Sequence, residues 1–346
     1  MTSIYNWLYD YISPIFGYIM LGIYKLVGGF GGYGFALVLF TILARCFMIP
    51  TSVSQQKGMA KQQRLAPKIR RIQEKYAGNQ QKIQEETQAL YQREGYNPMS
   101  AGCLPMLIQM PLIIGLFGVM YNPLRYALGI NVDDIKVLSD IFVDFAKNSS
   151  SEVIQKLVLD AKGNISTANS RYFPMYIIQY FNDIKDAVIA SGKVSTDTIS
   201  SISRFVAEKK FEMFGMQLGV KPQDMLKTEK IYYLIPVFSG VTSLLQAFIQ
   251  QRQQKKANPT MDKNPANGCM MIMMPAMSVW FTFMFPCGIG IYWGVSNIFS
   301  IVQSYVMKKV CSPQHEIAKL MVKETVERRS REANLKKIKE YEERNN

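Results

Sequence analysis

The stretch YGFALVLFTILARCFMIPTSVSQ, from Tyr33 to Gln55, decides the fold expected for this chain. It has about the length that a helix needs to cross the hydrocarbon core of a bilayer, and Arg45 lies near its middle. Arg45 lies roughly 18 Å from Tyr33 along such a helix, too deep to reach the nearer membrane surface unaided. Placing an arginine there costs at least about 2.5–3.5 kcal/mol, so the sequence predicts a specific role for Arg45.

Four other apolar runs accompany this one, and none of the five contains an acidic residue. The runs cover residues 33–54, 101–121, 231–251, 269–286 and 288–307. They predict an all-α polytopic membrane protein with a core of five transmembrane helices. Within the predicted crossings Arg45 has no carboxylate partner. It must therefore face water, backbone carbonyls and neutral polar side chains, or await an acidic group from another molecule.

The distribution of charge predicts which loops face the cytoplasm. The net charge is +14 over 346 residues. Residues 55–100, 252–268 and 308–346 carry nine, four and eleven Lys or Arg residues against four, one and seven acidic residues, whereas 122–230 carries fourteen basic and thirteen acidic residues. Positive charge on alternate loops indicates a plasma-membrane protein with a cytoplasmic carboxyl terminus. Attraction to anionic lipid explains the excess most simply, and RNA is the alternative.

The remaining segment boundaries follow from glycine, proline and charge. Residues 1–32 end in the glycine-rich run Gly28–Gly32, and a helix from Ser13 to Val27 is about 22 Å long. That length favours an N-terminal helix in the membrane interface over a sixth crossing, which stays the alternative. The other predicted segments are a first crossing at 33–55, a helical hairpin at 56–100, a second crossing at 101–121, an extracellular insertion at 122–230, a third crossing at 231–251, a loop at 252–268, the fourth and fifth crossings at 269–307 and a basic tail at 308–346.

The segment 56–100 carries two apolar stripes at helical spacing, separated by Gly78–Asn79 and ended by Gly95 and Asn97–Pro98. The pattern predicts a cytoplasmic hairpin of two helices that pack mainly on each other. A charged, soluble linker is the alternative. The stripes consist of Met59, Leu65, Ile69, Ile72 and Tyr76, and of Ile83, Thr87, Leu90 and Tyr91.

The second crossing combines two features that indicate a hydrated cavity beside Arg45. Pro111 frees the carbonyl of Leu107 and bends the helix, which requires neighbouring donors or water. Gln109 adds a neutral polar side chain to the same stretch.

Two further segments are predicted without site chemistry. The insertion 122–230 reads as a mostly helical cap or spacer, with helices at 133–146, 151–159, 176–190 and 196–214. The fourth crossing holds six methionines, at positions 270, 271, 273, 274, 277 and 284. Methionine fills irregular gaps, which favours core packing there; a soft surface that accommodates varied apolar guests is the alternative.

Several classes of function lack the residues they need. The five cysteines have no C-x-x-C spacing, and the single histidine, His315, lies in the tail. Coupled transport uses Asp, Glu or His within the membrane, and a membrane protease needs paired carboxylates, a Ser/His pair or a metal cluster. We therefore expect no enzyme, no catalytic residue, no metal and no cofactor. A passive anion channel or transporter using Arg45 remains the alternative.

Four motifs, together with the first crossing and Arg45, give the chain a family resemblance. They are PKIRRIQEKY (67–76), NPMSAGCLPMLIQMP (97–111), IPVFSGVTSLLQ (235–246) and FPCGIGIYWGVSN (285–297). In order and spacing they resemble the YidC/Oxa/Alb membrane protein insertases. The absence of a large domain before the core is similar to the compact Gram-positive members, although 122–230 is longer than their corresponding loop and no lipoprotein-type signal peptide is present.

The resemblance implies a function and a site. Such insertases enclose a hydrophilic groove that opens to the cytoplasm and to lipid, and the groove arginine corresponds to Arg45. By position, Gln246, Trp293 and Gln109 are expected as groove neighbours. The implied partners are nascent membrane proteins, the ribosome through the basic tail and anionic lipids, with the Sec translocon as a further candidate.

Overall fold

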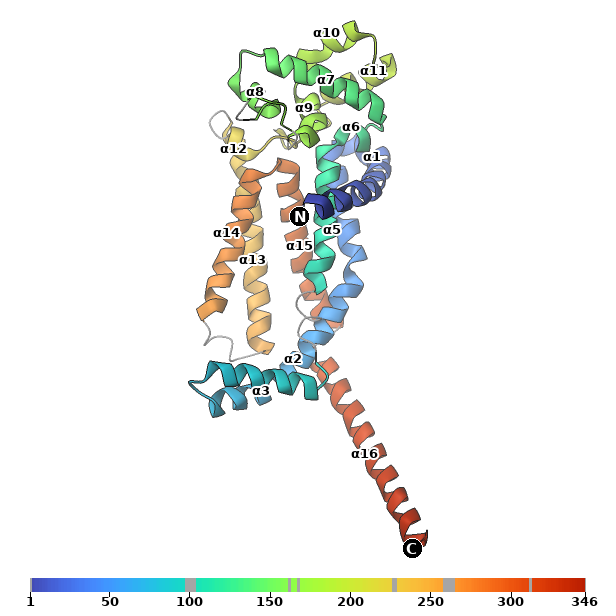
Figure 1. Cartoon of the computed structure of the whole chain (residues 1–346), viewed down its shortest axis with the longest axis vertical. Helices are drawn as coiled ribbons and strands as arrows, with labels where there is room; N and C mark the ends of the chain where they lie inside the picture. The colour runs from blue at the N-terminus through green and yellow to red at the C-terminus, as the bar shows by residue number, and fades with distance from the viewer. Residues whose placement is uncertain are drawn as a thin grey trace. The chain divides into compact units, whose positions relative to one another are not determined.

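The computed structural model describes residues 2–96, 104–160, 163–166, 169–225, 229–257, 265–310 and 313–345, and most of them are helical (Figure 1). The two short strands pair antiparallel, with Glu212 opposite Gln217. The elements are α1 Thr2–Phe47, α2 Ile49–Lys75, α3 Gln80–Arg93, α5 Leu104–Tyr121, α6 Pro123–Tyr126, α7 Val132–Asn148, α8 Glu152–Val158, η1 Ser170–Tyr172, α9 Phe173–Gln179, α10 Phe181–Ser191, α11 Thr196–Ala207, β1 Glu212–Met213, β2 Met216–Gln217, α12 Pro222–Met225, η2 Lys230–Tyr233, α13 Leu234–Ala257, α14 Pro265–Met284, α15 Cys287–Val310 and α16 Pro313–Asn345.

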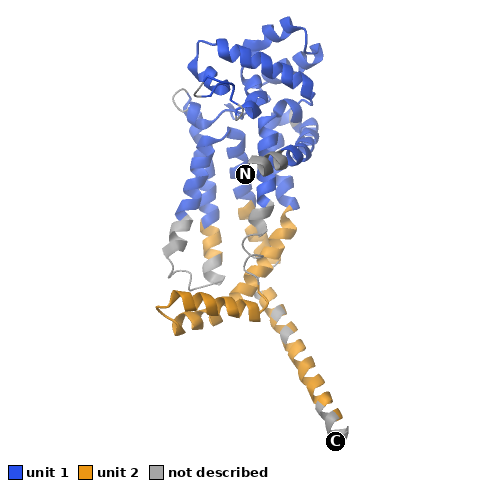
Figure 2. Cartoon of the chain, in the orientation of Figure 1, with its two compact units in different colours: residues 1–47, 107–247, 270–299 blue, residues 48–106, 248–269, 300–346 orange. Residues whose placement is uncertain are grey.

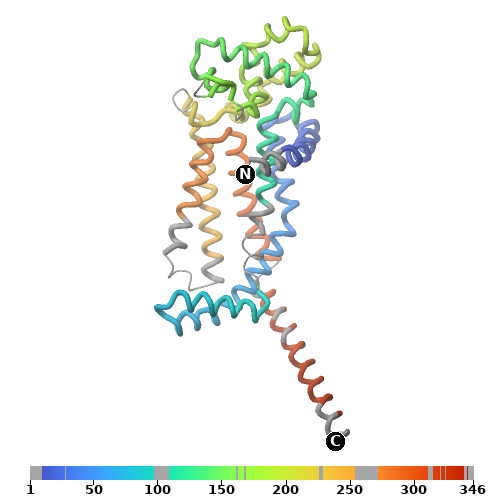
Figure 3. Tube along the Cα trace, in the orientation of Figure 1, coloured from blue at the N-terminus to red at the C-terminus, as the bar shows by residue number. Residues whose placement is uncertain are grey.

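The chain forms two compact units (Figure 2). Unit 1 comprises residues 1–47, 107–247 and 270–299, and unit 2 comprises residues 48–106, 248–269 and 300–346. Each unit is therefore assembled from three separate stretches of sequence, which can be followed along the Cα trace in Figure 3.

Gly32 divides α1 into two helical parts. Its φ of 66° and ψ of −163° are not helical. A Cβ at this position would lie 2.7 Å from the backbone oxygen of Lys210, and the next residue, Tyr33, donates its N–H to that oxygen at 2.7 Å. Only glycine satisfies both constraints, so the break predicted at the glycine run is present.

The part of α1 before Gly32 has one packed face and one exposed face. Met20 is fully buried, and Gly17 lies so close to the ring of Tyr126 that a Cβ would overlap it. The opposite face exposes large apolar side chains at helical spacing, among them Tyr11, Ile15, Tyr18 and Leu26. Such a face suits the interfacial helix predicted from the sequence. The choice between an interfacial and a crossing helix stays a prediction.

Helix α15 is the centre of the helices in unit 1, where α5, α13, α14 and α15 run alongside one another (Figure 1). Glycines in its first turns allow this close packing. A Cβ on Gly290 would lie 2.3 Å from the side chain of Ile235 on α13, and one on Gly288 would lie 2.2 Å from Met120 on α5. Small residues at such positions let two helix backbones approach closely and increase the van der Waals contact between them.

The insertion forms a helical cap within unit 1, with α7, α10 and α11 gathered beyond one end of the long helices (Figure 1). Its core is aromatic. Phe142 is fully buried, and the rings of Phe145, Phe173, Tyr176 and Tyr180 surround it at centroid distances of 6.0–6.5 Å. The described part of the cap is thus a packed domain, although the predicted helix at 196–214 ends early, at Ala207, and is followed by the β1–β2 hairpin.

A segment that we name the strap, residues 209–220, ties the cap to two long helices. The Lys210 carbonyl accepts the N–H of Tyr33 on α1. The carbonyls of Leu218 and Val220 accept the N–H groups of Gly288 and Cys287, each at 2.9 Å. Because these two groups belong to the first turn of α15, the strap supplies partners for donors that a helix leaves unsatisfied.

Unit 2 contains α2, α3 and α16. A small cluster of Leu65, Ile69 and Tyr96, with Leu90 and Tyr91 packed on it, joins α2 to α3 and the turn that follows. Helix α16 also packs against α2, a contact that the sequence did not predict. The predicted end of the hairpin at Asn97–Pro98 lies outside the described residues.

Two helices of the described chain have the length and hydropathy of membrane-spanning helices. They are Gly29–Phe47, in the second part of α1, and Lys230–Gln253, formed by η2 and most of α13; shorter apolar helical stretches cover Gln109–Tyr121 and Ile272–Met284. Two predicted boundaries also move. Helix α13 continues to Ala257 and α14 begins at Pro265, so both enter the predicted loop 252–268, whose middle, 258–264, lies outside the described residues.

The prediction of core packing for the methionines of α14 is wrong for those that the structure describes. Met273, Met274, Met277 and Met284 are exposed, and Met274 keeps 65% of its surface accessible. Their spacing explains this, because positions 273, 277 and 284 share a face of a helix with the exposed Trp280. The side chains of Met270 and Met271 lie outside the described set.

Candidate functional site

Arg45 lies in the last turn of α1, which corrects its predicted place near the middle of a helix over 33–55. Helix α1 ends at Phe47, and α2 follows with Met48 as its first flanking residue and Pro50 in its first turn. Proline has no N–H to donate to the preceding turn and clashes with it, so the helix is interrupted there. A cation at the C-terminal end of a helix is favoured by the partial negative charge of the free carbonyls.

The guanidinium of Arg45 binds a neutral partner on α15. Its Nε donates a hydrogen bond to Ser296 Oγ at 2.5 Å. Ser296 is buried, with 2% of its surface exposed, whereas Arg45 is half-buried. Among the residues that the structure describes, Arg45 forms no ion pair. A neutral polar side chain is one of the two environments that the sequence predicted for this arginine, and an acidic group from another molecule stays the alternative.

Gln109 joins the same site through Tyr292. Its Nε2 donates to the Tyr292 hydroxyl at 3.0 Å, and Ser296, one turn further along α15, is a second hydrogen-bond partner of that hydroxyl. The chain Arg45–Ser296–Tyr292–Gln109 thus links α1, α15 and α5. Two of the four predicted site residues meet here through two residues that the sequence reasoning did not name.

The other two predicted residues, Gln246 and Trp293, lie apart from this chain of contacts. Trp293 stacks on Phe281 of α14, with ring centroids 6.2 Å apart. Gln246 is half-buried on α13, one turn beyond Thr242. In the described structure neither residue is hydrogen-bonded to Arg45. Their place in a groove therefore remains a prediction.

Further neutral polar contacts continue across unit 1. Asn297 Nδ2 donates to Thr242 Oγ1 at 3.2 Å, and the hydroxyls of Ser239 and Ser278 lie 2.9 Å apart. All four side chains are buried. The signal in the sequence was the spacing of Ser239, Thr242 and Ser243 in an apolar run, since only a face that meets other polar groups can bury them at low cost. Together with Arg45 and Gln109 these residues form a polar seam through apolar helices.

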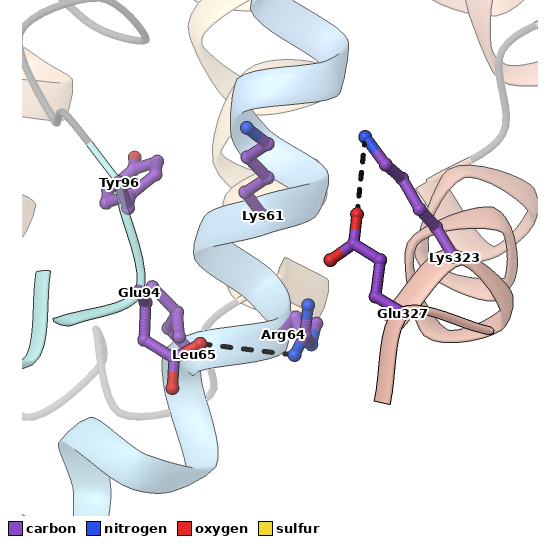
Figure 4. A pocket seen from close by; sticks show the side chains of 7 residues that line it. All are labelled: Lys61, Arg64, Leu65, Glu94, Tyr96, Lys323 and Glu327. Carbon is purple, nitrogen blue, oxygen red and sulfur yellow. Dashed lines mark ion pairs between the residues drawn. The ribbon is translucent and has the colours of Figure 1, made fainter. Parts of the chain in front are cut away.

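Unit 2 holds a cavity of a different character, of about 180 Å³ (Figure 4). Two ion pairs lie around it, Arg64 with Glu94 at 4.0 Å and Lys323 with Glu327 at 3.9 Å. Burial, and then repulsion from Tyr91, raises the pKa of Tyr96, which keeps its hydroxyl neutral. The lining residues are Lys61, Arg64, Leu65, Glu94, Tyr96, Lys323 and Glu327.

The described residues contain no group of three or more His, Cys, Asp or Glu side chains that could hold a metal ion. Of the described cysteines, Cys46 is exposed and Cys287 is buried, and neither forms a disulfide.

Three named relatives align with large parts of this chain. The membrane protein insertase MisCA of Bacillus subtilis is 25% identical over 288 residues, which cover 82% of this chain and 72% of that protein. The membrane protein insertase YidC of Pelodictyon phaeoclathratiforme is 26% identical over 311 residues, or 89% of this chain and 39% of that protein. The YidC of Wolinella succinogenes is 35% identical over 144 residues, which cover 40% of this chain and 26% of that protein.

The chain thus spans nearly three quarters of the Bacillus protein but well under half of the other two. A family model also matches, described as 60Kd inner membrane protein, over residues 23–314. This match includes Arg45, the polar seam and the strap. Because it covers well over half of the sequence, the chain belongs to the 60Kd inner membrane protein family, and its resemblance to the YidC/Oxa/Alb insertases is confirmed.

Proposed function

We propose that this chain is a membrane protein insertase, as its MisCA and YidC relatives are named. In this proposal a hydrated groove receives the polar or acidic segment of a nascent membrane protein and releases its apolar helix into lipid. Arg45, Gln109, Gln246 and Trp293 belong to the groove. The process uses no covalent chemistry, metal or cofactor.

The observation that carries the proposal is the neutral environment of Arg45. Its Nε binds the uncharged Ser296, and the acidic residues of the described chain form no ion pair with it. Hydrogen bonds to neutral groups fix the guanidinium without neutralising it, so it can attract an acidic segment in a partly desolvated place. A permanent carboxylate at this position would compete with that segment.

The proposed membrane arrangement uses five helices, α5, α13, α14, α15 and the part of α1 after Gly32. In this arrangement α2, α3 and α16 are cytoplasmic, and the cap is extracellular. The support is the excess of basic residues in 55–100, 252–268 and 308–346 over the balanced cap. A membrane-impermeant thiol reagent applied from outside should label a cysteine at Ser150 and spare one at Asn79. Labelling of Asn79 alone would reverse the topology.

The proposed partners beyond the nascent chain are the ribosome, anionic lipids and the Sec translocon. Support for the first two is α16, whose exposed length carries basic residues such as Arg328, Arg329 and Arg331. Deleting residues 316–346 should weaken co-sedimentation with ribosomes in a salt-sensitive manner, because contacts with phosphates release counterions. Unchanged co-sedimentation at low salt would leave anionic lipid as the partner of the tail.

The deciding experiment is complementation of bacteria depleted of their own insertase. The readout is insertion of a small single-span client, with its translocated acidic residues either kept or neutralised. We expect the wild-type chain to restore insertion of both clients. Failure to restore either, combined with chloride flux in proteoliposomes that depends on Arg45, would replace the insertase with the anion channel.

A further inference from the structure

The tip of the β1–β2 hairpin in the strap presents an aromatic side chain in a strained position. Phe214 has a φ of +54°, and Gly215 follows with a φ of +78°. Two positive φ values are typical of a tight two-residue hairpin turn, where Asn, Asp and Gly are the favoured residues. A phenylalanine pays a conformational cost there. Phe214 nevertheless keeps 75% of its surface exposed, so packing within the described chain does not explain its presence.

The hairpin lies at one end of both helices that are long and apolar enough to span a membrane. Met213 packs on Gly34, near the start of Gly29–Phe47: a Cβ on that glycine would lie 2.8 Å from the Met213 sulfur. The other helix begins at Lys230. Its third residue, Tyr232, accepts a hydrogen bond from the Gln217 N–H at 3.0 Å, and Ile231 lies 3.9 Å from where a Cβ on Gly215 would be.

Because the hairpin contacts the same end of two candidate spans, its tip lies at the level where those spans leave the hydrocarbon. The residues around the tip are of the kinds found at the boundary between lipid headgroups and acyl chains. Phe30, Tyr233 and Leu234 are exposed, by 96%, 45% and 55%. Lys209 and Lys230 are exposed as well. Aromatic rings with basic residues beside them are typical of the boundary between headgroups and acyl chains.

We propose that Phe214 inserts into the lipid bilayer at this boundary and anchors the strap, and with it the cap, to the membrane surface. The ring enters the region between headgroups and acyl chains, and Lys209 and Lys230 face anionic headgroups. Lipid is the occupant that the position selects, since the tip is continuous with the apolar surfaces of two spans. The inference requires those helices to cross a bilayer and is independent of insertase activity.

Spin-label depth measurements test the position directly. The five native cysteines are replaced by alanine, a nitroxide is attached to F214C in the full chain, and the protein is placed in nanodiscs of equal parts phosphatidylethanolamine and phosphatidylglycerol. The matched control is I189C on α10, because Ile189 is also an exposed apolar residue of the cap, at 53%. We expect the ratio of oxygen to nickel-chelate accessibility to be severalfold higher at 214 than at 189. Equal ratios would overturn the proposal, as would concentration-dependent spin coupling at 214, which would indicate a second copy of the chain.

Two substitutions at Phe214 distinguish lipid anchoring from turn strain, because the two explanations predict opposite changes in the hydrogen-exchange rate of the strap. Asparagine tolerates a positive φ, so F214N relieves the backbone strain at residue 214. If the tip were surrounded by water, this relief would stabilise the strap and slow its hydrogen exchange. As a lipid anchor, Phe214 gives the opposite result: F214N makes exchange over 209–220 severalfold faster in nanodiscs, while F214W, which keeps an interfacial aromatic, leaves it unchanged. The control I189N should not alter the strap. Slower exchange in F214N would contradict the proposal.

Discussion

The two units differ in the partners of their basic side chains. In unit 1, Arg45 is fixed by neutral Ser296. In unit 2, Glu94 pairs with both Arg64 and Lys68, and Arg70 pairs with Glu74 at 2.9 Å. Ion pairs that solvent reaches, fully or in part, contribute roughly 0–1 kcal/mol and are screened by salt. Among these residues, the cations of unit 2 are paired with a carboxylate, whereas Arg45 contacts a neutral hydroxyl and keeps its charge uncompensated, as the proposed function requires.

The two units also differ in how many large side chains they bury. Unit 1 buries aromatic and aliphatic side chains throughout, with Tyr33, Phe40, Phe142 and Phe181 among the largest that are almost fully buried. The α2–α3 pair rests on one small cluster around Leu65. A region with few buried contacts opens at low free energy. We therefore expect unit 1 to determine global stability and the hairpin of unit 2 to be the more mobile part.

The largest expected effect is on activity, when the charge of Arg45 is changed. Arg45→Glu should abolish insertion of clients with acidic tails, because it repels them. Arg45→Ala should reduce insertion of these clients by at least about tenfold, equivalent to about 1.4 kcal/mol in the barrier. Arg45→Lys should keep much of the activity, since variable tails need the charge and not a fixed bidentate geometry. The assay compares clients with acidic and with neutralised tails.

The matched control is Arg64→Ala, which removes a paired cation from unit 2 and should leave both clients inserted. The Arg45→Ala protein should remain folded, with a melting temperature in detergent close to that of the wild type. The substitution removes one hydrogen bond, which contributes about 1 kcal/mol to stability, but it also removes a half-buried charge that is costly to desolvate. Ser296 keeps Tyr292 as a hydrogen-bond partner. Global unfolding of Arg45→Ala would make the arginine a structural residue, and normal insertion of both clients would make it dispensable.

The next effect is on the stability of unit 1, through Gly32→Ala. Residue 32 has a positive φ, and a Cβ at this position would lie 2.7 Å from a backbone oxygen. We therefore expect the free energy of unfolding to fall by about 2–3 kcal/mol. Thermal unfolding in detergent measures it. Gly29→Ala is the control, because nothing lies within 4 Å of its Cβ and alanine favours a helix by about 0.5–1 kcal/mol. Equal melting temperatures for the two variants would mean that the strap does not hold α1.

A smaller and local effect is expected in unit 2 from Leu65→Ala. Leu65 is 3% exposed in the cluster between α2 and α3, and its truncation should cost about 2 kcal/mol, at the low end for a buried leucine. Hydrogen exchange over 57–95 should become roughly thirtyfold faster, while the exchange of residues 287–299, the part of α15 in unit 1, is unchanged. Leu90→Ala, at the half-buried edge of the cluster, should have a weaker effect. Destabilisation of α15 by Leu65→Ala would show that the two units are not energetically separate.

The smallest expected effect comes from Glu94→Gln, which removes the carboxylate shared by Arg64 and Lys68. We expect hairpin opening to become easier by about 0.5 kcal/mol at low salt. At high salt the difference should vanish, because the ion pairs are screened. The control Glu74→Gln breaks an exposed pair within one helix and should change exchange less. An effect of Glu94→Gln that persists at high salt would indicate packing by the Glu94 side chain.

The sequence predicted the parts of this structure that local patterns specify. The apolar runs indicated the long helices, the glycine run indicated the break at Gly32, and the lack of acids in those runs indicated neutral partners for Arg45. It missed Ser296 and Tyr292, because a buried hydroxyl in an apolar helix has no distinguishing local pattern. Only the meeting of α1 and α15, 251 residues apart at this contact, identifies them.

Other errors also arose where tertiary contacts decide. The helix predicted over 33–55 ends at Phe47. The apolar residues continue beyond this point, but Pro50 interrupts the helix. The methionines of α14 were assigned to a core, but apolar character alone does not distinguish a buried face of a helix from an exposed one, and Met273, Met274, Met277 and Met284 are exposed. The strand β1 and the turn residue Phe214 were assigned to the end of the helix predicted over 196–214, because Phe214 carries no usual hairpin signal.

The central position of α15 has a consequence for how the protein is made. Ser296 leaves the ribosome 251 residues after Arg45, which at bacterial and eukaryotic synthesis rates is a delay of roughly ten to fifty seconds. Gln109 and Thr242 also wait for partners on this last apolar helix. During that interval the guanidinium of Arg45 is present without the Ser296 hydroxyl to which it later donates a hydrogen bond. We therefore expect water or another polar group outside the chain to solvate Arg45 until α15 has been synthesised.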